Sequence, residues 1–299
     1  MGAEEKLRFY QVGKRDFRGA DLWGSPMENF CFRGVNLDSA NLPAANLNGA
    51  RLIDVNLSNG NLTKVGLMNS IFINVNLSGA NLGMADLRGA HWIDVDLRGA
   101  DLSRAKLDYA CLCGVNLQNA VLNDTQITEN TVFCETIMPD GSIQNHPTRV
   151  LSAQELLRRY AAGERNFERI VLHHTDLSGA DLRFAQMINA KLSYVNLSGA
   201  NCGPAGWMGA SVVFSDLRNA NLGNLHLHSA RLICSDFRGA NLIMVSPEAA
   251  VFLGCNLQTA NWVRAGGRFE ETFIHTTWVD GTIINPIDSD FYWDGENGL

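Results

Sequence analysis

The sequence has no long apolar run and no basic leader. None of its 299 residues belongs to an uninterrupted apolar stretch of the roughly 18 residues that a membrane-spanning helix needs. The opening MGAEEKLRFYQ is charged where a secretory signal would be apolar. Residue 6 is Lys6, where the myristoylation pattern requires Ser or Thr. We therefore expect a soluble, cytoplasmic protein without a lipid anchor.

Cysteines are too few and too scattered to form a disulfide framework. The chain has seven of them, an odd number, whereas small secreted disulfide proteins have many at regular spacings. We expect reduced thiols. With 46% apolar residues, the chain is long enough to bury a sizeable core in one large or two medium domains.

An internal repeat organises most of the sequence. Every fifth residue from Phe17 to Ile137 is apolar, and the pattern resumes from Phe167 to Trp262 with only Pro247 as an exception. A small residue stands two positions before each of these, and Asp or Asn often stands one position before, so that the unit reads A(D/N)LxG. A period of five fits neither the 3.6 of a helix nor the 2 of a strand. It predicts a chain that turns at regular intervals.

A second period groups four pentapeptides into a larger unit of 20 residues. The triplet VNL starts at positions 35, 55, 75 and 115, and VDL starts at 95. The simplest object with both periods is a coil with four short sides, each contributing one large and one small inward residue. Successive coils would stack at the spacing of hydrogen-bonded strands, about 4.8 Å. The large residues would fill the axis, so folding would need neither a metal nor a disulfide.

These repeats closely resemble those of the pentapeptide repeat family, over roughly 230 of the 299 residues. The resemblance implies an all-β fold, a right-handed quadrilateral parallel β-helix. Most members of the family act as binding surfaces or scaffolds, and cyanobacterial members include an inhibitor of heterocyst differentiation. The resemblance therefore implies a non-catalytic protein–protein interaction or scaffold module, with a regulatory role conceivable. Because a few members mimic DNA and inhibit gyrase, the alternative is a DNA-mimicking inhibitor or protector of a type II topoisomerase.

The sequence contains two similar beginnings. EKLRFYQVGKRDF at 5–17 matches ELLRRYAAGERNF at 155–167, and both lead directly into repeats. In the second copy, Ser152 and Glu155 form a capping-box pattern, and Gly163 ends the helical stretch. Both copies resemble the helical N-terminal cap of cyanobacterial-type pentapeptide repeat proteins, and a solenoid needs such a cover over its terminal coil. We therefore predict two tandem solenoids, each with a short α-helical cap.

Two similar endings, TIMPDGSI and TWVDGTI, place an Asp-Gly turn at the end of each half. The first solenoid is predicted to cover 1–143, with a cap helix at about 3–12 and repeats over 17–137, followed by a linker at 144–150. The second covers 151–299, with a cap helix at about 152–162, repeats over 167–283 and an acidic aromatic tail over 284–299. Near the end of the second half, Phe273 and Trp278 carry the pattern one residue out of step. The 20-residue phase is shared by both halves, which leaves open one continuous solenoid with a large loop.

One outward face is unusually apolar. If continuous, it would be larger than the apolar patches that soluble monomers usually expose, so something should cover it. The cover could be the cap helix or the other solenoid, or the face could bind a protein partner or a second copy of the chain. Ile53, Ile73 and Ile93 would form the centre of such a surface. The candidate interaction residues are Ile53, Ile71, Ile73, Ile93, Cys113, Phe133, Val213, Ile233, Val251 and Leu253.

Two other faces are polar. One pairs opposite charges and is predicted to be a neutral, solvated surface: Asp16 with Arg18, Asp96 with Arg98, Asp216 with Arg218, and Asp236 with Arg238. Another is a ladder of asparagines, for which we predict hydrogen bonding within the turns: Asn41, Asn61, Asn81, Asn201, Asn221, Asn241 and Asn261.

The net charge of −7 lies entirely in residues 269–299, which hold seven acidic and no basic side chains, while the remaining residues balance 24 acidic against 24 basic ones. A DNA mimic would carry its negative charge along the solenoid, and a nucleic-acid-binding protein would show a basic stripe. We therefore expect a protein partner, with no nucleic acid and no membrane. In the tail, Phe291, Tyr292 and Trp293 either cap the solenoid end or anchor a partner.

Few residues have the pattern of a chemical site. Cys111 and Cys113 flank one central residue, and His91 lies one coil earlier in the same column, so the three could approach one another. Three soft ligands on a flat face make a poor zinc site, and we favour a packing role. The sequence has no phosphate loop and no nucleophile elbow. We predict no catalytic residues, no cofactor and no metal, and hence no enzyme.

Overall fold

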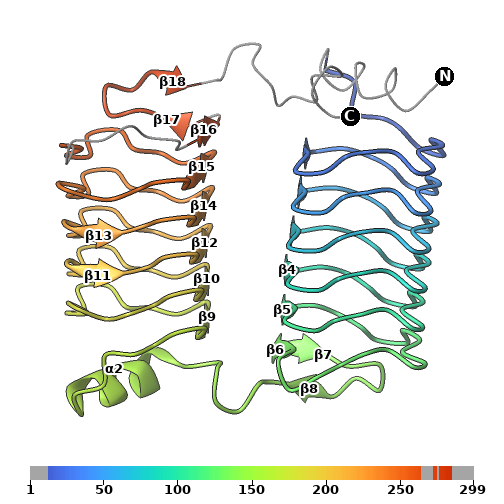
Figure 1. Cartoon of the computed structure of the whole chain (residues 1–299), viewed down its shortest axis with the longest axis horizontal. Coiled ribbons are helices and arrows are strands. Elements are labelled where there is room, and N and C mark those ends of the chain that lie inside the picture. Colours follow the sequence, from blue (N-terminus) through green and yellow to red (C-terminus); the bar gives the residue numbers. More distant parts are fainter. Residues whose placement is uncertain (1–12, 264–271, 275, 285–299) are drawn as a thin grey trace. The chain divides into compact units, whose positions relative to one another are not determined.

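Two compact units make up the chain in the computed structural model, which describes residues 13–263, 272–274 and 276–284 (Figure 1). Unit 1 is the part of the described chain up to His146, and unit 2 is the part from Pro147. Within the described ranges, no helix has the length and apolarity required to cross a membrane.

Both units are parallel β-solenoids, which confirms the predicted all-β class. Figure 1 shows the coils of each unit stacked with their short strands in one sheet. The six-stranded sheet of unit 1 contains β1 (Cys31–Arg33), β2 (Arg51–Ile53), β3 (Ile71–Ile73), β4 (His91–Ile93), β5 (Cys111–Cys113) and β6 (Val132–Cys134). The six-stranded sheet of unit 2 contains β9 (Val171–His173), β10 (Lys191–Ser193), β12 (Ser211–Val213), β14 (Arg231–Ile233), β15 (Val251–Leu253) and β16 (Thr272–Ile274). On another side of unit 2, β11 (Ala205–Gly206) pairs in parallel with β13 (Leu225–His226).

Neighbouring coils pair on four sides at the 20-residue offset that the sequence predicts. In unit 1, strands pair on one side, and single bridges join the coils on the other three, as in Asp16–Asn36, Asp21–Asn41 and Pro26–Asn46. Backbone groups of one coil bond to the next coil, so that the Leu37 N–H donates to the Asn56 carbonyl at 2.6 Å. This pairing satisfies the polar backbone around the apolar axis.

The axis of each unit is filled by the apolar residues of the five-residue period. In unit 1, the rings of Phe72 and Trp92 stack with centroids 4.8 Å apart and planes 8° from parallel. In unit 2, Trp207 and Phe237 are buried among leucines. The small residues of the repeat, such as Ala80, are buried as well. Each buried large side chain contributes roughly 1.5–3 kcal/mol, so this column is the main source of stability.

The corners of the coils explain the Asn, Asp and Gly of the repeat. At one corner, Asn59 has a φ of 55°, and the Gly60 N–H donates to the Leu57 carbonyl at 3.2 Å. A positive φ at the third residue is the feature of a type II turn, and Gly and Asn tolerate it best. The preceding asparagine supports the same corner, because the Ser58 N–H donates to Asn56 Oδ1 at 3.1 Å. Each pentapeptide therefore encodes one side and one corner.

The last coil of unit 1 departs from the predicted register. Strands β5 and β6 pair at an offset of 21 residues, with Leu112 opposite Phe133. Phe133 therefore packs against the axial core, and its prediction as a flanking residue of the apolar face was wrong. Ile127, predicted as central, is 41% exposed. The cause is one additional residue in the turn before β6, which the unbroken apolar five-residue pattern conceals.

The same offset occurs in unit 2, where β15 and β16 pair Phe252 with Phe273. Phe273 and Trp278 pack against the core there, which confirms the predicted change of phase. In unit 1, Met138 packs against the core at the corresponding place.

The last described strands of each unit form a hairpin. In unit 1, β7 (Thr136–Ile137) pairs antiparallel with β8 (Ile143–Gln144), and in unit 2, β17 (Thr276–Thr277) pairs in the same way with β18 (Ile283–Ile284). The turns are similar as well: the Ser142 N–H donates to Asp140 Oδ1 and the Thr282 N–H to Asp280 Oδ1, both at 2.9 Å. These are the two Asp-Gly turns that the sequence predicts.

Unit 2 begins with helix α2 (Ala153–Ala161), at the place where the sequence predicts a cap helix. Ser152 Oγ accepts a hydrogen bond from the Glu155 N–H at 3.2 Å, which forms half of the predicted capping box. The Glu155 carboxylate pairs with Arg158 instead of returning to Ser152. Leu156 is fully buried in the core of unit 2. The other predicted cap helix, at about 3–12, lies outside the described residues.

The predicted linker, 144–150, is paired at both of its ends. Gln144 belongs to β8, and the His146 N–H donates to the Phe133 carbonyl at 2.8 Å. Val150 forms a parallel bridge with Val171 in unit 2. Most of this segment therefore extends the coils that precede and follow it.

Candidate functional site

The predicted interaction residues lie beside the central residues of the long sheets. On β3, Phe72 belongs to the axial core, and Ile71 and Ile73 flank it. Side chains alternate along a strand, so Ile71 and Ile73 point away from the axis of their own coil. Their exposed fractions in the chain are nevertheless 1% and 0%.

The other flanking residues follow this pattern, and we call the flanking positions of the two long sheets the strand face. Its buried predicted members are Ile53, Ile93, Cys113, Val213, Ile233 and Leu253. Val251 is half-buried, and Cys134 takes the place opposite Cys113 that the prediction gave to Phe133. The strand face is thus largely buried in the chain, and its role in binding stays a prediction. The predicted tail anchors Phe291, Tyr292 and Trp293 lie outside the described residues.

In the charged pairs of the polar sides, each aspartate bonds to the arginine two residues later. Arg98 Nη2 lies 2.7 Å from Asp96 Oδ2, and the hydrogen bonds from Arg98 hold the pKa of Asp96 below its usual value. The same bonding joins the other three predicted pairs and two that the sequence analysis did not include, Arg88 with Asp86 and Arg183 with Asp181. Since each pair is neutral, these sides carry little net charge.

The asparagine ladder forms hydrogen bonds from coil to coil. In unit 2, Asn221 Nδ2 donates to Asn201 Oδ1 and Asn241 Nδ2 donates to Asn221 Oδ1, each at 2.9 Å. In unit 1, Asn61 Nδ2 donates to Asn41 Oδ1 at 3.0 Å. Within the turns, the Gly83 N–H donates to Asn81 Oδ1 at 2.9 Å and the Ile243 N–H donates to Asn241 Oδ1 at 3.2 Å, which confirms the predicted bonding there.

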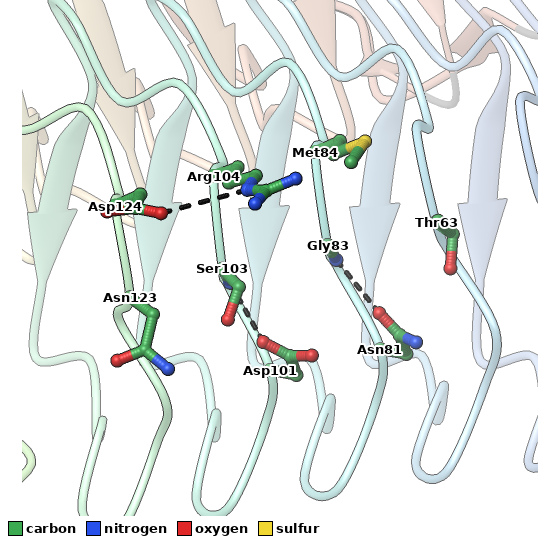
Figure 2. Close-up of a pocket in the computed structure, with 9 residues that line it drawn as sticks. All are labelled: Thr63, Asn81, Gly83, Met84, Asp101, Ser103, Arg104, Asn123 and Asp124. Atoms are coloured by element: carbon green, nitrogen blue, oxygen red, sulfur yellow. Dashed lines mark hydrogen bonds and ion pairs between the residues drawn. The ribbon is translucent and has the colours of Figure 1, made fainter.

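Further along the same side of unit 1, the surface has a shallow, open depression of about 420 Å³. One cause is Gly83, which contributes no side chain; a Cβ there would lie 3.0 Å from Asn81 Oδ1. Figure 2 shows the lining residues on successive coils: Thr63, Asn81, Gly83, Met84, Asp101, Ser103, Arg104, Asn123 and Asp124.

The depression combines exposed charges with one exposed apolar side chain. Arg104 Nε lies 3.7 Å from Asp124 Oδ2, and the two side chains are 64% and 78% exposed. Such a pair contributes at most about 1 kcal/mol, so Arg104 can exchange it for another partner. Met84 beside it is 44% exposed. The sequence analysis missed this site, although GMADLRGA places a glycine and a methionine together at a corner of the coil.

A second open depression, of about 800 Å³, lies beside α2 in unit 2. The charged residues that line it are already paired with one another: Arg158 with Glu155 at 2.8 Å, and Arg159 with Glu164. This depression therefore offers fewer available charges than the one around Arg104.

The repeat that builds both units matches a known family model. The model of pentapeptide repeats matches in 8 copies, over residues 16–52, 31–65, 50–89, 84–119, 166–201 and 210–243. The chain belongs to the pentapeptide repeat family. In this pentapeptide repeat protein, the matched segments include repeats of both units.

Several solved structures are similar to this pentapeptide repeat protein. HetL, a pentapeptide repeat protein involved in heterocyst differentiation regulation from the cyanobacterium Nostoc sp. strain PCC 7120, is 25% identical, with 95% of this chain and 100% of HetL covered and a TM-score of 0.25. Rfr23 from the cyanobacterium Cyanothece 51142 is 25% identical over 45% of this chain and 99% of its own, with a TM-score of 0.22. QnrB1, a plasmid-mediated fluoroquinolone resistance protein, is 14% identical over 76% of this chain and 81% of its own, with a TM-score of 0.34. No curated protein matches. The family assignment rests on the repeats themselves.

Proposed function

We propose that this pentapeptide repeat protein is a non-catalytic protein-interaction module, which presents the flat outer sides of its solenoids to a cytoplasmic protein partner. The observation that supports this proposal is the filled axis of each unit, where Phe72, Trp92 and Trp207 are at most 2% exposed. A filled axis leaves recognition to the outer sides. Flat sides with side chains in fixed register suit a macromolecule, whereas small-molecule sites are usually enclosed.

The proposal includes an architecture of two tandem, right-handed quadrilateral solenoids, with the boundaries predicted from the sequence. Helix α2, whose Leu156 is buried in the core of unit 2, supports a helical cap for the second solenoid. The match between 5–17 and 155–167 supports a similar cap for the first.

The depression around Met84 and Arg104 is our candidate contact surface. Methionine and arginine are enriched at the centres of protein interfaces, and arginine is frequent among the residues whose truncation weakens binding most. The strand face around Ile53, Ile73 and Ile93 stays a second candidate for a partner or a second copy of the chain.

The polar sides do not support the alternative of a DNA mimic. A DNA mimic needs a row of unpaired negative charges along the solenoid, whereas Asp86, Asp96 and Asp216 each bind an arginine of their own coil. We expect no inhibition in a gyrase supercoiling assay, and inhibition at low micromolar concentration would favour the alternative.

The proposal can be tested by affinity capture with the immobilised full chain. Proteins retained from a lysate of the source organism are identified, and the binding of each is then measured with purified components. Two variants alter the depression, Met84→Glu and Arg104→Glu. The matched control is Lys106→Glu, which reverses an exposed charge two residues away on the next side of the coil.

We expect Arg104→Glu to weaken binding of the true partner at least about tenfold, which corresponds to 1.4 kcal/mol, and Lys106→Glu to leave it within about twofold. Equal binding by wild type and both depression variants would reject this surface. Failure to retain any protein specifically would count against an interaction role.

A further inference from the structure

Soft metal-binding side chains gather on the strand face near the end of unit 1. Cys111 and Cys113 flank Leu112 on β5, and their Sγ atoms are 3.5 Å apart. His91 on β4 lies directly opposite Cys111 in the parallel register. The ligand atoms of His91, Cys111 and Cys113 are all within 4.8 Å of one another.

The altered register of the last coil brings a fourth potential ligand next to this group. Because β5 and β6 pair at an offset of 21 residues, Cys134 lies opposite Cys113. The Cα atoms of Cys113 and Cys134 are direct partners of adjacent strands, so the two side chains start from neighbouring positions on the strand face. A strict 20-residue period would have placed Phe133 here. Cys134 Sγ is not among the ligand atoms that lie within 4.8 Å of one another, so Cys134 would complete the ligand set by turning its side chain toward the other three as the ion binds.

We propose that His91, Cys111, Cys113 and Cys134 bind one Zn²⁺ ion. One histidine and three cysteines form a common ligand set of structural zinc sites. At a Zn–S distance of about 2.3 Å, tetrahedral geometry places two sulfur ligands about 3.8 Å apart, close to the 3.5 Å between Cys111 and Cys113. A closed site of this kind would strengthen the fold and would not activate water.

Metal binding changes the protonation of the site. Cysteine binds zinc as the thiolate, so three S–H bonds break, three Zn–S bonds form and three protons are released as the ion binds. The imidazole of His91 binds through a neutral nitrogen. With three thiolates, the bound ion would give a site of net charge −1, which is far cheaper to bury than three thiolates without a metal.

A disulfide is the chemical alternative. Cys111 and Cys113 are two residues apart on one strand, so their Cα atoms are separated by about 6.6 Å, at the upper end of the range for disulfides. Cys113 and Cys134 lie on adjacent strands about 4.8 Å apart, which is within that range. All the cysteines of the structure are in the free form.

The test uses the full chain, reduced and stripped of metal with a chelator, and titrated with Zn²⁺ or Co²⁺ alone. We expect one equivalent of either metal to bind. Bound cobalt should show a near-ultraviolet sulfur-to-cobalt absorption with the intensity of three thiolates, and bound zinc should raise the unfolding temperature. The cobalt spectrum of the wild type counts the thiolate ligands, so this result does not depend on the folding of any variant.

Variants then assign the ligands. Loss of an outer-shell partner of a metal site costs about 10- to 100-fold in affinity, so we expect Cys111→Ser and Cys113→Ser to lose at least about 100-fold. Cys134→Ser should reduce the cobalt absorption from three thiolates to two. The matched control is Cys31→Ser, which removes a cysteine of the same column on β1, several coils away, and should change nothing.

Several results would contradict the zinc site or its fourth ligand. The absence of zinc and cobalt uptake by the wild type would overturn the proposal. So would uptake that persists unchanged in folded Cys111→Ser and Cys113→Ser, or a native Cys113–Cys134 disulfide detected by peptide mass. A two-thiolate spectrum that is unaffected by Cys134→Ser would overturn the assignment of the fourth ligand.

Discussion

Replacing Asn221 with alanine removes three hydrogen bonds of the asparagine ladder at once. Asn221 Nδ2 donates to Asn201 Oδ1 at 2.9 Å, and its Oδ1 accepts from Asn241 Nδ2 at 2.9 Å and from the Gly223 N–H at 3.2 Å. A hydrogen bond of this kind contributes a net 0.5–1.5 kcal/mol or so. Since Asn221 is half-buried, we expect Asn221→Ala to lower the free energy of unfolding of unit 2 by about 2–4 kcal/mol.

A second variant separates the donor from the acceptor. Asn221→Asp keeps an oxygen for Asn241 and Gly223 but places a carboxylate oxygen against Asn201 Oδ1, so we expect an intermediate loss of about 1–2 kcal/mol. The control is Asn123→Ala, at an exposed position of unit 1, which should change stability by less than about 0.5 kcal/mol.

Urea unfolding followed by hydrogen exchange of peptides from each unit reports these changes separately, because the two units need not unfold together. A loss below about 0.5 kcal/mol in Asn221→Ala, or an aspartate variant as unstable as the alanine variant, would refute the reasoning about the ladder.

Three further predictions concern the core, the charged pairs and the cap. Phe72→Ala should cost about 3–5 kcal/mol in urea unfolding, while Met84→Ala at an exposed corner should cost less than about 0.5 kcal/mol; similar costs would argue against a filled axis. Arg98 lowers the folded-state pKa of Asp96, so this pair stabilises the fold above the unfolded pKa of about 3.9. Its contribution is below about 1 kcal/mol and is lost as the pH falls through the folded pKa. Asp96→Asn should flatten that part of the acid unfolding curve, and an unchanged curve would contradict the assignment. Gly163→Ala should cost about 1–2 kcal/mol by thermal unfolding through backbone strain alone, since Gly163 has a φ of 97° and open space where a Cβ would lie; no loss would contradict the strained cap.

The repeat made most of the fold predictable because each pentapeptide specifies one side and one corner. The central apolar residue fixes the axis, the asparagine before it fixes the turn, and the 20-residue period fixes the pairing of the coils. The helix that begins unit 2 was predictable as well, because Ser152 and Gly163 are local end signals whose effect does not depend on the rest of the chain.

The register of the last coil of unit 1 was not predicted, because Ile127, Val132 and Ile137 continue the apolar five-residue pattern although one residue has been added. An available signal was the similarity between Phe133 in unit 1 and Phe273 in unit 2, where the change of phase was recognised. This one-residue error also concealed Cys134 as a neighbour of Cys113.

The direction of the candidate interaction side chains could be predicted from the sequence, but their exposure could not. Strand alternation gives the direction of Ile53, Ile73 and Ile93 relative to their own coil, but it does not give their exposed fractions. The depression around Arg104 was missed for a different reason, since its shape depends on side chains from successive coils.

Hydrogen exchange of the full chain, with and without its captured partner, tests the central claim most directly. We predict slower exchange in the complex for peptides that contain residues 81–84 and 101–104, with little change in the core strands β3 and β4. Unchanged exchange at the depression, or protection confined to the strand face, would contradict the account.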